Sequence, residues 1–173
     1  MDAPVRRYAA LRICPERADA AFPLARIAAP ALTIERWRGL VRGLAEIGAG
    51  GGSGILLAED ESRYIYGLCT FHSCLDLQQG EQVLNAELVV PNLIDPRPVA
   101  GTLLRAMRSQ AEASDCRAVI VHLPVTAAAT DDRPRGLQSA LADAGFAATP
   151  MMRWRLPVPP RGAAKPAAWV VDS

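Results

Sequence analysis

The chain has 173 residues, of which 50% are hydrophobic and 21% are charged, and its formal net charge is +1. This length suits one domain with a sizeable core. Lys and Arg form no stripe interleaved with aromatic residues, which excludes the usual electrostatic footprint of nucleic-acid binding. No apolar run approaches the roughly 18 residues that a membrane-spanning helix needs. We therefore expect a protein that binds neither nucleic acid nor membrane.

The N-terminus and the cysteines indicate the compartment. Residues 1–14 carry charges but no long apolar run, so we expect no signal peptide. No two of the four cysteines have CxxC spacing, and three lie in apolar strand-like runs, where a free thiol packs as a small hydrophobe. The four are Cys14, Cys69, Cys74 and Cys116. This pattern favours a cytoplasmic, reduced protein over one held by structural disulfides.

The first third of the chain predicts a strand and two helices. Residues 7–14 are typical of a strand, and the alanine-rich residues 16–27 of a helix that stops before Pro30. Thr33 can cap a second helix over residues 34–48, whose apolar residues recur at helical spacing.

A glycine-rich segment, "GAGGGSG" at residues 48–54, follows the second helix and leads into a strand. A phosphate-binding loop needs the reverse order, a strand before the loop and a helix after it, and ends in Gly-Lys-Ser/Thr. The segment lacks both features, so we interpret it as a connection.

The middle of the chain predicts an antiparallel meander of three strands. The strands cover residues 54–60, 63–74 and 82–90. A charged turn, "DESR" at residues 60–63, joins the first two, and residues 75–81 turn into the third.

The second half alternates helices and strands. After a loop with three prolines, residues 99–114 predict an amphipathic helix, and residues 116–124 a buried strand with almost no polar alternation. A short helix over residues 137–144 has Gly145 as its C-terminal cap, and residues 146–158 predict a last, interrupted strand.

This order of elements resembles that of the GNAT-type N-acetyltransferases, from about Tyr8 to Leu156. The resemblance implies an α/β fold, a mixed and largely antiparallel sheet flanked by helices, with a splay between the fourth and fifth strands. We expect one such domain over residues 1–156. The tail, residues 157–173, is expected to pack on that domain or on a partner.

Two short motifs carry the resemblance most specifically. The family often has E-L-x-V-x-P-x-x-[QR]-x-x-G-x-[GA]-x-x-L-L, and residues 87–104 match its length. The agreeing positions are Glu87, Leu88, Val90, Ala100, Leu103 and Leu104. Near the C-terminus, "ALADAGF" is similar to the family's helix-end motif, with Gly145 and Phe146 in agreement.

The resemblance implies acetyl-CoA as co-substrate, bound in the splay. Its pantetheine arm would pair with the edge of the fourth strand at Leu88, Val89 and Val90. Its pyrophosphate would lie on the N-terminus of the following helix, where unpaired N–H groups and the helix dipole favour an anion. The cofactor-binding positions there are Arg97, Val99, Ala100, Gly101 and Thr102.

Two departures weaken this anion site. Asp95 stands where the family has Gln or Arg, and Pro98 where it has its first glycine. Proline removes an N–H, and an aspartate beside a pyrophosphate is electrostatically unfavourable. Proline is nonetheless well tolerated in the first turn of a helix, and Arg97 and the Thr102 hydroxyl remain as donors.

The resemblance also assigns catalytic roles. Glu87 is the candidate general base, with an ordinary hydrogen-bonding role as the alternative, and Asn85 shares its strand face. The backbone N–H near Leu88 or Val89 would polarise the thioester carbonyl. The family's usual thiolate acid is a tyrosine, and Leu141 occupies that position.

Both histidines have a functional and a structural interpretation. His122 ends the fifth strand and could act as base or acid in the splay, or be a structural histidine. His72 could line the acceptor pocket. Cys69 and Cys74, on either side of it in sequence, fall on opposite strand faces, so we expect no metal site.

Two functions follow as hypotheses. The first is an acetyl-CoA-dependent N-acyltransferase that acts directly on a primary amine of a small molecule or peptide. The second is a catalytically silent module that binds acyl-CoA or a protein partner. A homodimer is possible if the C-terminal tail adds a strand to a second copy.

Overall fold

The computed structural model describes residues 7–47, 52–91, 95–123, 135–148 and 153–159. In chain order the elements are β1 (Ala9–Arg12), the 3-10 turn η1 (Pro15–Arg17), α1 (Ala18–Ala28), α2 (Ile34–Ile47), β2 (Ser53–Glu59), β3 (Ile65–Asp76), β4 (Glu81–Val89), α3 (Pro96–Ala113), β5 (Ala118–His122), α4 (Arg135–Asp143), β6 (Ala147–Ala148) and β7 (Arg153–Pro157). No helix in these ranges is both long and apolar enough to cross a membrane.

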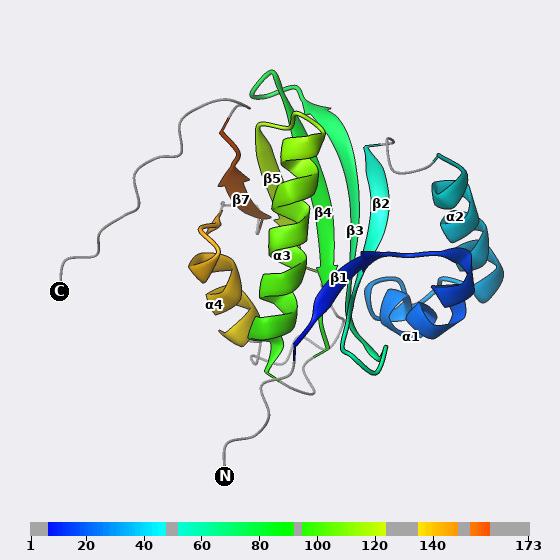
Figure 1. Cartoon of the computed structure of the whole chain (residues 1–173). Coiled ribbons are helices and arrows are strands. Elements are labelled where there is room, and N and C mark those ends of the chain that lie inside the picture. Colours follow the sequence, from blue (N-terminus) through cyan, green and yellow to red (C-terminus); the bar gives the residue numbers. More distant parts are fainter. Residues whose placement is uncertain (1–6, 48–51, 92–94, 124–134, 149–152, 160–173) are drawn as a thin grey trace, which may run out of the picture.

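The strands form one twisted sheet in the order β1-β2-β3-β4-β5-β7-β6. The pairing of β4 with β5 is parallel, and the other pairings between these strands are antiparallel. Helices α1 and α2 lie on one side, over the β1–β3 end of the sheet, and α3 and α4 lie on the other side (Figure 1). The predicted mixed, largely antiparallel α/β sheet is confirmed.

Alternation along the strands builds a separate core on each side. Leu68 and Val89 pack with α1 and α2, whereas the neighbouring Cys69 and Leu88 pack with α3 and α4. Trp37 anchors the first core: it is 1% exposed, and its indole Nε1–H donates to the Ala18 carbonyl at 2.7 Å.

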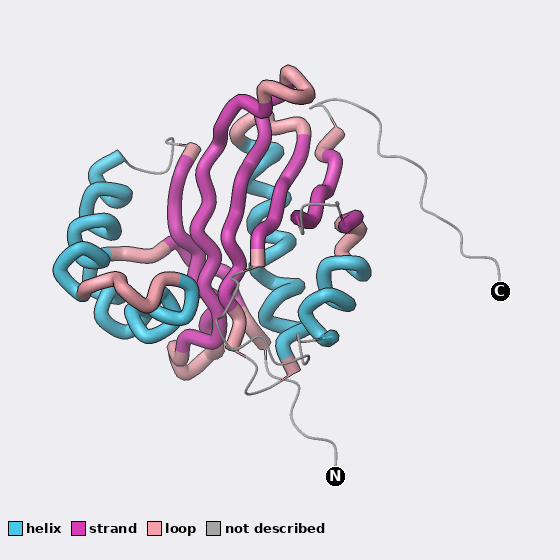
Figure 2. Tube along the Cα trace, turned by 180° about the vertical axis from the view of Figure 1, so that it is seen from behind, coloured by secondary structure: helices cyan, strands magenta, loops and turns pink. Residues whose placement is uncertain are grey.

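α1 and α2 cover only part of their side of the sheet. Figure 2 shows β4, β5 and β7 from this side with no helix in front of them. The predicted caps of α2 and α4 are confirmed, because the Thr33 hydroxyl accepts from the Arg36 N–H at 3.3 Å and Gly145 has a φ of +85°.

Two elements differ from the sequence-based boundaries. α3 begins at Pro96 rather than Val99, because Asp95 caps it and proline is pre-organised for the first helical position. The last predicted strand consists of two, β6 and β7, which pair with each other. Most of the glycine-rich connection, at 48–51, and the tail, at 160–173, lie outside the described residues.

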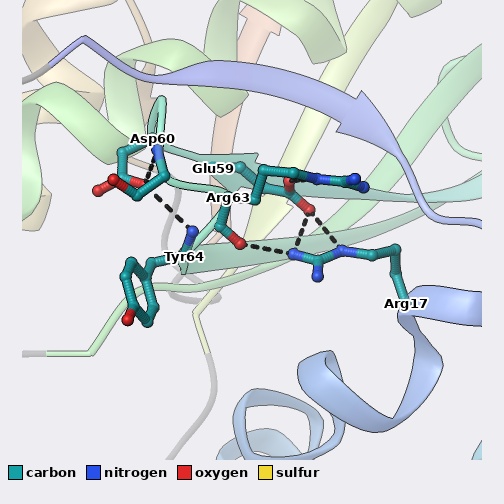
Figure 3. A network of polar contacts seen from close by, with 6 residues as sticks. Arg17, Glu59, Asp60, Arg63 and Tyr64 are labelled. Carbon is teal, nitrogen blue, oxygen red and sulfur yellow. Dashed lines mark hydrogen bonds and ion pairs between the residues drawn. The ribbon is translucent and has the colours of Figure 1, made fainter.

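A buried carboxylate fastens η1 to the β2–β3 turn. Glu59 is 4% exposed, and its Oε1 accepts from Arg17 Nε at 3.1 Å and Nη2 at 2.9 Å (Figure 3). The same Nη2 donates to the Arg63 carbonyl at 2.7 Å. Asp60 folds the turn by accepting from the N–H groups of Ser62 and Tyr64. One guanidinium thus holds a turn 42 residues away.

We expect Arg17→Met to lower the free energy of unfolding by about 2–3 kcal/mol, because it leaves a buried carboxylate without its nearest donors. Urea denaturation measures this change. Arg38→Met is the matched control, since Arg38 pairs with Asp19 on the surface and exposed ion pairs contribute little. Equal losses in both variants would contradict this role for Glu59.

Candidate functional site

The candidate site lies where β4 and β5 separate. Their parallel pairing runs from Val83 and Ala118 to Glu87 and His122, where β5 ends. β4 continues to Val89, and these last residues pair with β3 on the other side. The parallel pairing therefore ends at Glu87, the end at which the resemblance predicts a splay between the fourth and fifth strands.

The backbone of Leu88 faces this gap. The Gln82 carbonyl accepts from the Arg117 N–H at 2.7 Å, which shows that Gln82 points its backbone groups toward β5. Backbone direction alternates with period two, and the β4 register has no irregularity. Leu88 has the same parity as Gln82, so its N–H and C=O point toward β5. The pairing of Glu87 with His122 places the Leu88 N–H against the His122 carbonyl, and the Leu88 C=O is the first group beyond the pairing.

The side chains at this point lie on the face that α1 and α2 leave partly uncovered. Glu87 is half-buried, and its register partners are Thr70 on β3 and His122 on β5. Asn85 and His72 are partners of each other one step away on the same face. The structure thus places Glu87, His122, Asn85 and His72 on one face of the sheet.

Within this group, one polar contact is already formed. The Asn85 amide Nδ2 lies 2.8 Å from Cys74 Sγ, which ties that side chain toward the β3–β4 hairpin. His72 is exposed to solvent. Among the described residues, no group of three or more His, Cys, Asp or Glu side chains could hold a metal ion.

The N-terminus of α3 carries its own anion. The Asp95 carboxylate accepts from the Arg97 backbone N–H at 3.1 Å, and also from the Arg97 guanidinium at 2.9 Å through Nε and at 2.9 Å through Nη2. These hydrogen bonds from Arg97 hold the pKa of Asp95 below its usual value.

Few donors are left in this turn for another anion. The first four N–H groups of a helix have no partner within it, but here two of the four positions are Pro96 and Pro98, and Arg97 is used by Asp95. Val99 is fully buried. The Thr102 hydroxyl donates to the Pro98 carbonyl at 2.9 Å. The residues at the β4 edge fit a thioester arm, whereas this helix turn does not fit a pyrophosphate.

Two glycines allow the first turn of α3 to pack closely against β3 and α4. A methyl group on Gly67 of β3 would lie 2.7 Å from Val99 Cγ1, and one on Gly136 of α4 would lie 3.0 Å from Pro96 Cγ. The turn is therefore packed closely between strand and helix. The sequence-based analysis missed both residues, although an isolated glycine inside a strand indicates a close approach.

Leu141 and Cys69 are both buried in the core on the α3 and α4 side of the sheet. Leu141 is 0% exposed in the core beneath α3 and α4. Cys69 is fully buried, and burial, with a smaller contribution from the Glu87 charge, raises the pKa of its thiol. A depression of about 220 Å³ lies elsewhere, between α2 and the β1–η1 connection, and contains none of the predicted site residues.

Comparison with solved structures identifies this architecture. An acetyltransferase of the GNAT family from Streptococcus pneumoniae superposes with a TM-score of 0.63 at 13% identity, over 88% of this chain and 100% of the other. The chain has the GNAT fold.

Other structures with this fold are similar to the same extent. An aminoglycoside N-acetyltransferase in complex with CoA has a TM-score of 0.64 at 13% identity, over 86% of this chain and 93% of its own. A variant of spermidine N-acetyltransferase from Vibrio cholerae has 0.61 at 10% identity, over 87% and 94%. No family model and no curated protein matches the sequence.

We expect Gly67→Ala to destabilise the GNAT fold by about 1–3 kcal/mol, because the added methyl group overlaps Val99 in a packed core. Gly43→Ala in α2 is the control: nothing lies within 4 Å of the new methyl group, and alanine favours the helix by up to about 1 kcal/mol. Thermal unfolding of both variants should show opposite signs. A Gly67→Ala variant as stable as the parent would contradict the close packing of α3.

Proposed function

We propose that this chain transfers an acyl group, in the first instance acetyl, from a thioester directly to a primary amine at the end of β4. The observation that carries the proposal is the end of the β4–β5 pairing at Glu87. The backbone of the next residue, Leu88, points away from β3, and the Glu87 carboxylate beside it is half-buried. The fold shared with aminoglycoside and spermidine N-acetyltransferases supports it.

The donor is a pantetheine thioester such as acetyl-CoA, and one structure with this fold contains CoA. A thioester supplies an activated acyl carbon. The edge of β4 from Leu88 to Val90 offers backbone groups to an extended arm, as a strand edge does to a peptide. The next N–H on that side of the chain, that of Val90, would stabilise negative charge on the thioester oxygen.

Glu87 is the proposed general base. An amine is protonated near neutral pH, so it must lose a proton before its nitrogen can attack. Nitrogen then bonds to the acyl carbon, the carbon–sulfur bond breaks, and the nitrogen releases its surplus proton to water. The thiolate takes a proton from water, because Leu141 offers none. His122, the register partner of Glu87, is the proposed second group for proton transfer.

The acceptor would approach from the sheet face opposite α3. His72 and Asn85 lie along this face beside Glu87 and are the proposed acceptor-binding residues. Nearby, Arg155 pairs with Glu81 at 2.9 Å, which places further charge of both signs along the same strands. A small-molecule or peptide amine suits this mixed polar surface.

A second candidate function is a binding module without turnover. It is favoured by the residue type at position 141, where leucine replaces the tyrosine that usually protonates the thiolate in the family that the chain resembles. Such a module would bind a thioester or a protein partner through the same gap and release no thiol with any amine.

We expect Glu87→Gln to lower the rate of thiol release about 100- to 10,000-fold, the usual effect of removing a general base. Thiol release from acetyl thioesters over a panel of amines measures it. Glu112→Gln is the matched control, because Glu112 lies on α3, on the other side of the sheet, and pairs with Arg108; it should keep the parent rate. Equal rates in the parent and Glu87→Gln would remove Glu87 from the mechanism, and no release by the parent would favour the binding module.

A further inference from the structure

The first turn of α3 is closed to a pyrophosphate by the chain itself. Helix N-termini attract anions because their first N–H groups lack partners and their dipole is positive. In this turn two of the four N–H groups are absent, at Pro96 and Pro98, and Asp95 takes the Arg97 N–H. The position that an external anion would occupy is filled by a carboxylate.

The charges in the turn also cancel. Both oxygens of Asp95 accept from the Arg97 guanidinium, so the one cation in the turn faces a carboxylate rather than solvent. The pair is 48% and 61% exposed, so its own strength is small. Its effect is instead local: an arriving phosphate finds the Arg97 charge already paired with the Asp95 carboxylate.

The backbone cannot reopen the site by a local rearrangement. The proline rings fix φ at two positions, and Pro96 is buried against Gly136 of α4. Val99, and Leu103 one turn further along α3, pack closely over Gly67 of β3. A flexible glycine loop could adapt to a phosphate, whereas this turn is clamped on both sides.

We propose that the acyl donor is recognised through its pantetheine thioester arm alone. Asp95 prevents the phosphates of the nucleotide from contributing to the free energy of binding. This inference rests on the proposed function, because it concerns the same gap. Asp95 is then a specificity-determining residue. The chain should use an acetyl thioester of pantetheine as well as it uses acetyl-CoA, because the two share the arm and differ in the nucleotide.

The test compares two probes, acetyl-CoA and acetyl-pantetheine, by calorimetric titration of the full chain. We expect the parent to bind them with dissociation constants within about threefold of each other, less than one hydrogen bond would contribute. Asp95→Asn keeps a cap side chain, because asparagine caps helices as well as aspartate does. It removes the negative charge, so acetyl-CoA should bind about tenfold more tightly and acetyl-pantetheine should not change, as expected for one charge-assisted contact.

Glu112→Gln is the matched control. Glu112 pairs with Arg108 of the same helix, so the variant makes the same change in net charge. It lies 17 residues from Asp95, about 25 Å along a helix, and both affinities should stay at the parent values. A tenfold gain for acetyl-CoA in this variant would overturn a local role for Asp95.

The remaining outcomes separate the two proposals. A parent that binds acetyl-CoA about a hundredfold more tightly than acetyl-pantetheine, the contribution of two phosphate contacts, would overturn this inference and leave the acyltransferase in place. An unchanged affinity ratio in Asp95→Asn would overturn the role of Asp95. Binding of neither probe by the parent and by Asp95→Asn would overturn the proposed function itself.

Discussion

The candidate site depends on where the pairing of β4 with β5 stops. β5 has five residues and β4 has nine, and their parallel pairing ends at Glu87 and His122. Backbone N–H and C=O groups beyond that pair need another partner or solvent. Two features follow from this unequal length: Glu87 is the last paired residue, and the Leu88 C=O lies beyond the pairing.

The order of the elements could be predicted from the sequence because hydrophobic period and turn residues are local signals. The register of Glu87 with Thr70 and His122 follows once the strands are known. The contact of Arg17 with Glu59 could not be predicted, since it joins residues 42 apart and neither has a distinctive neighbourhood in sequence. The packing of Gly67 under Val99 could be predicted only in part, because a glycine inside a strand indicates a close approach but not which residue makes it.

The N-terminus of α3 shows the limit of assigning a function to this turn from the family's sequence motif alone. The residues that depart from the family pattern are visible in the sequence, but their combined effect is not. Asp95 is unfavourable to an anion as an isolated charge; as the cap of α3 it also uses the Arg97 N–H and guanidinium. The helix begins at Pro96, before the Val99 that the sequence pattern predicts, because proline suits the first helical position. The same residues therefore begin and cap α3 and leave fewer N–H groups for another anion.

The most direct test is a nitrogen-15 NMR titration with acetyl-pantetheine that follows two amides of β4. Leu84 and Leu88 have the same parity, but Leu84 is paired with Val119 of β5 and Leu88 lies beyond the pairing. If a thioester arm occupies the gap, the Leu88 amide resonance should move strongly while that of Leu84 hardly changes. A Leu88 amide that stays unchanged while the thioester binds elsewhere would contradict the placement of the acyl group at the end of β4.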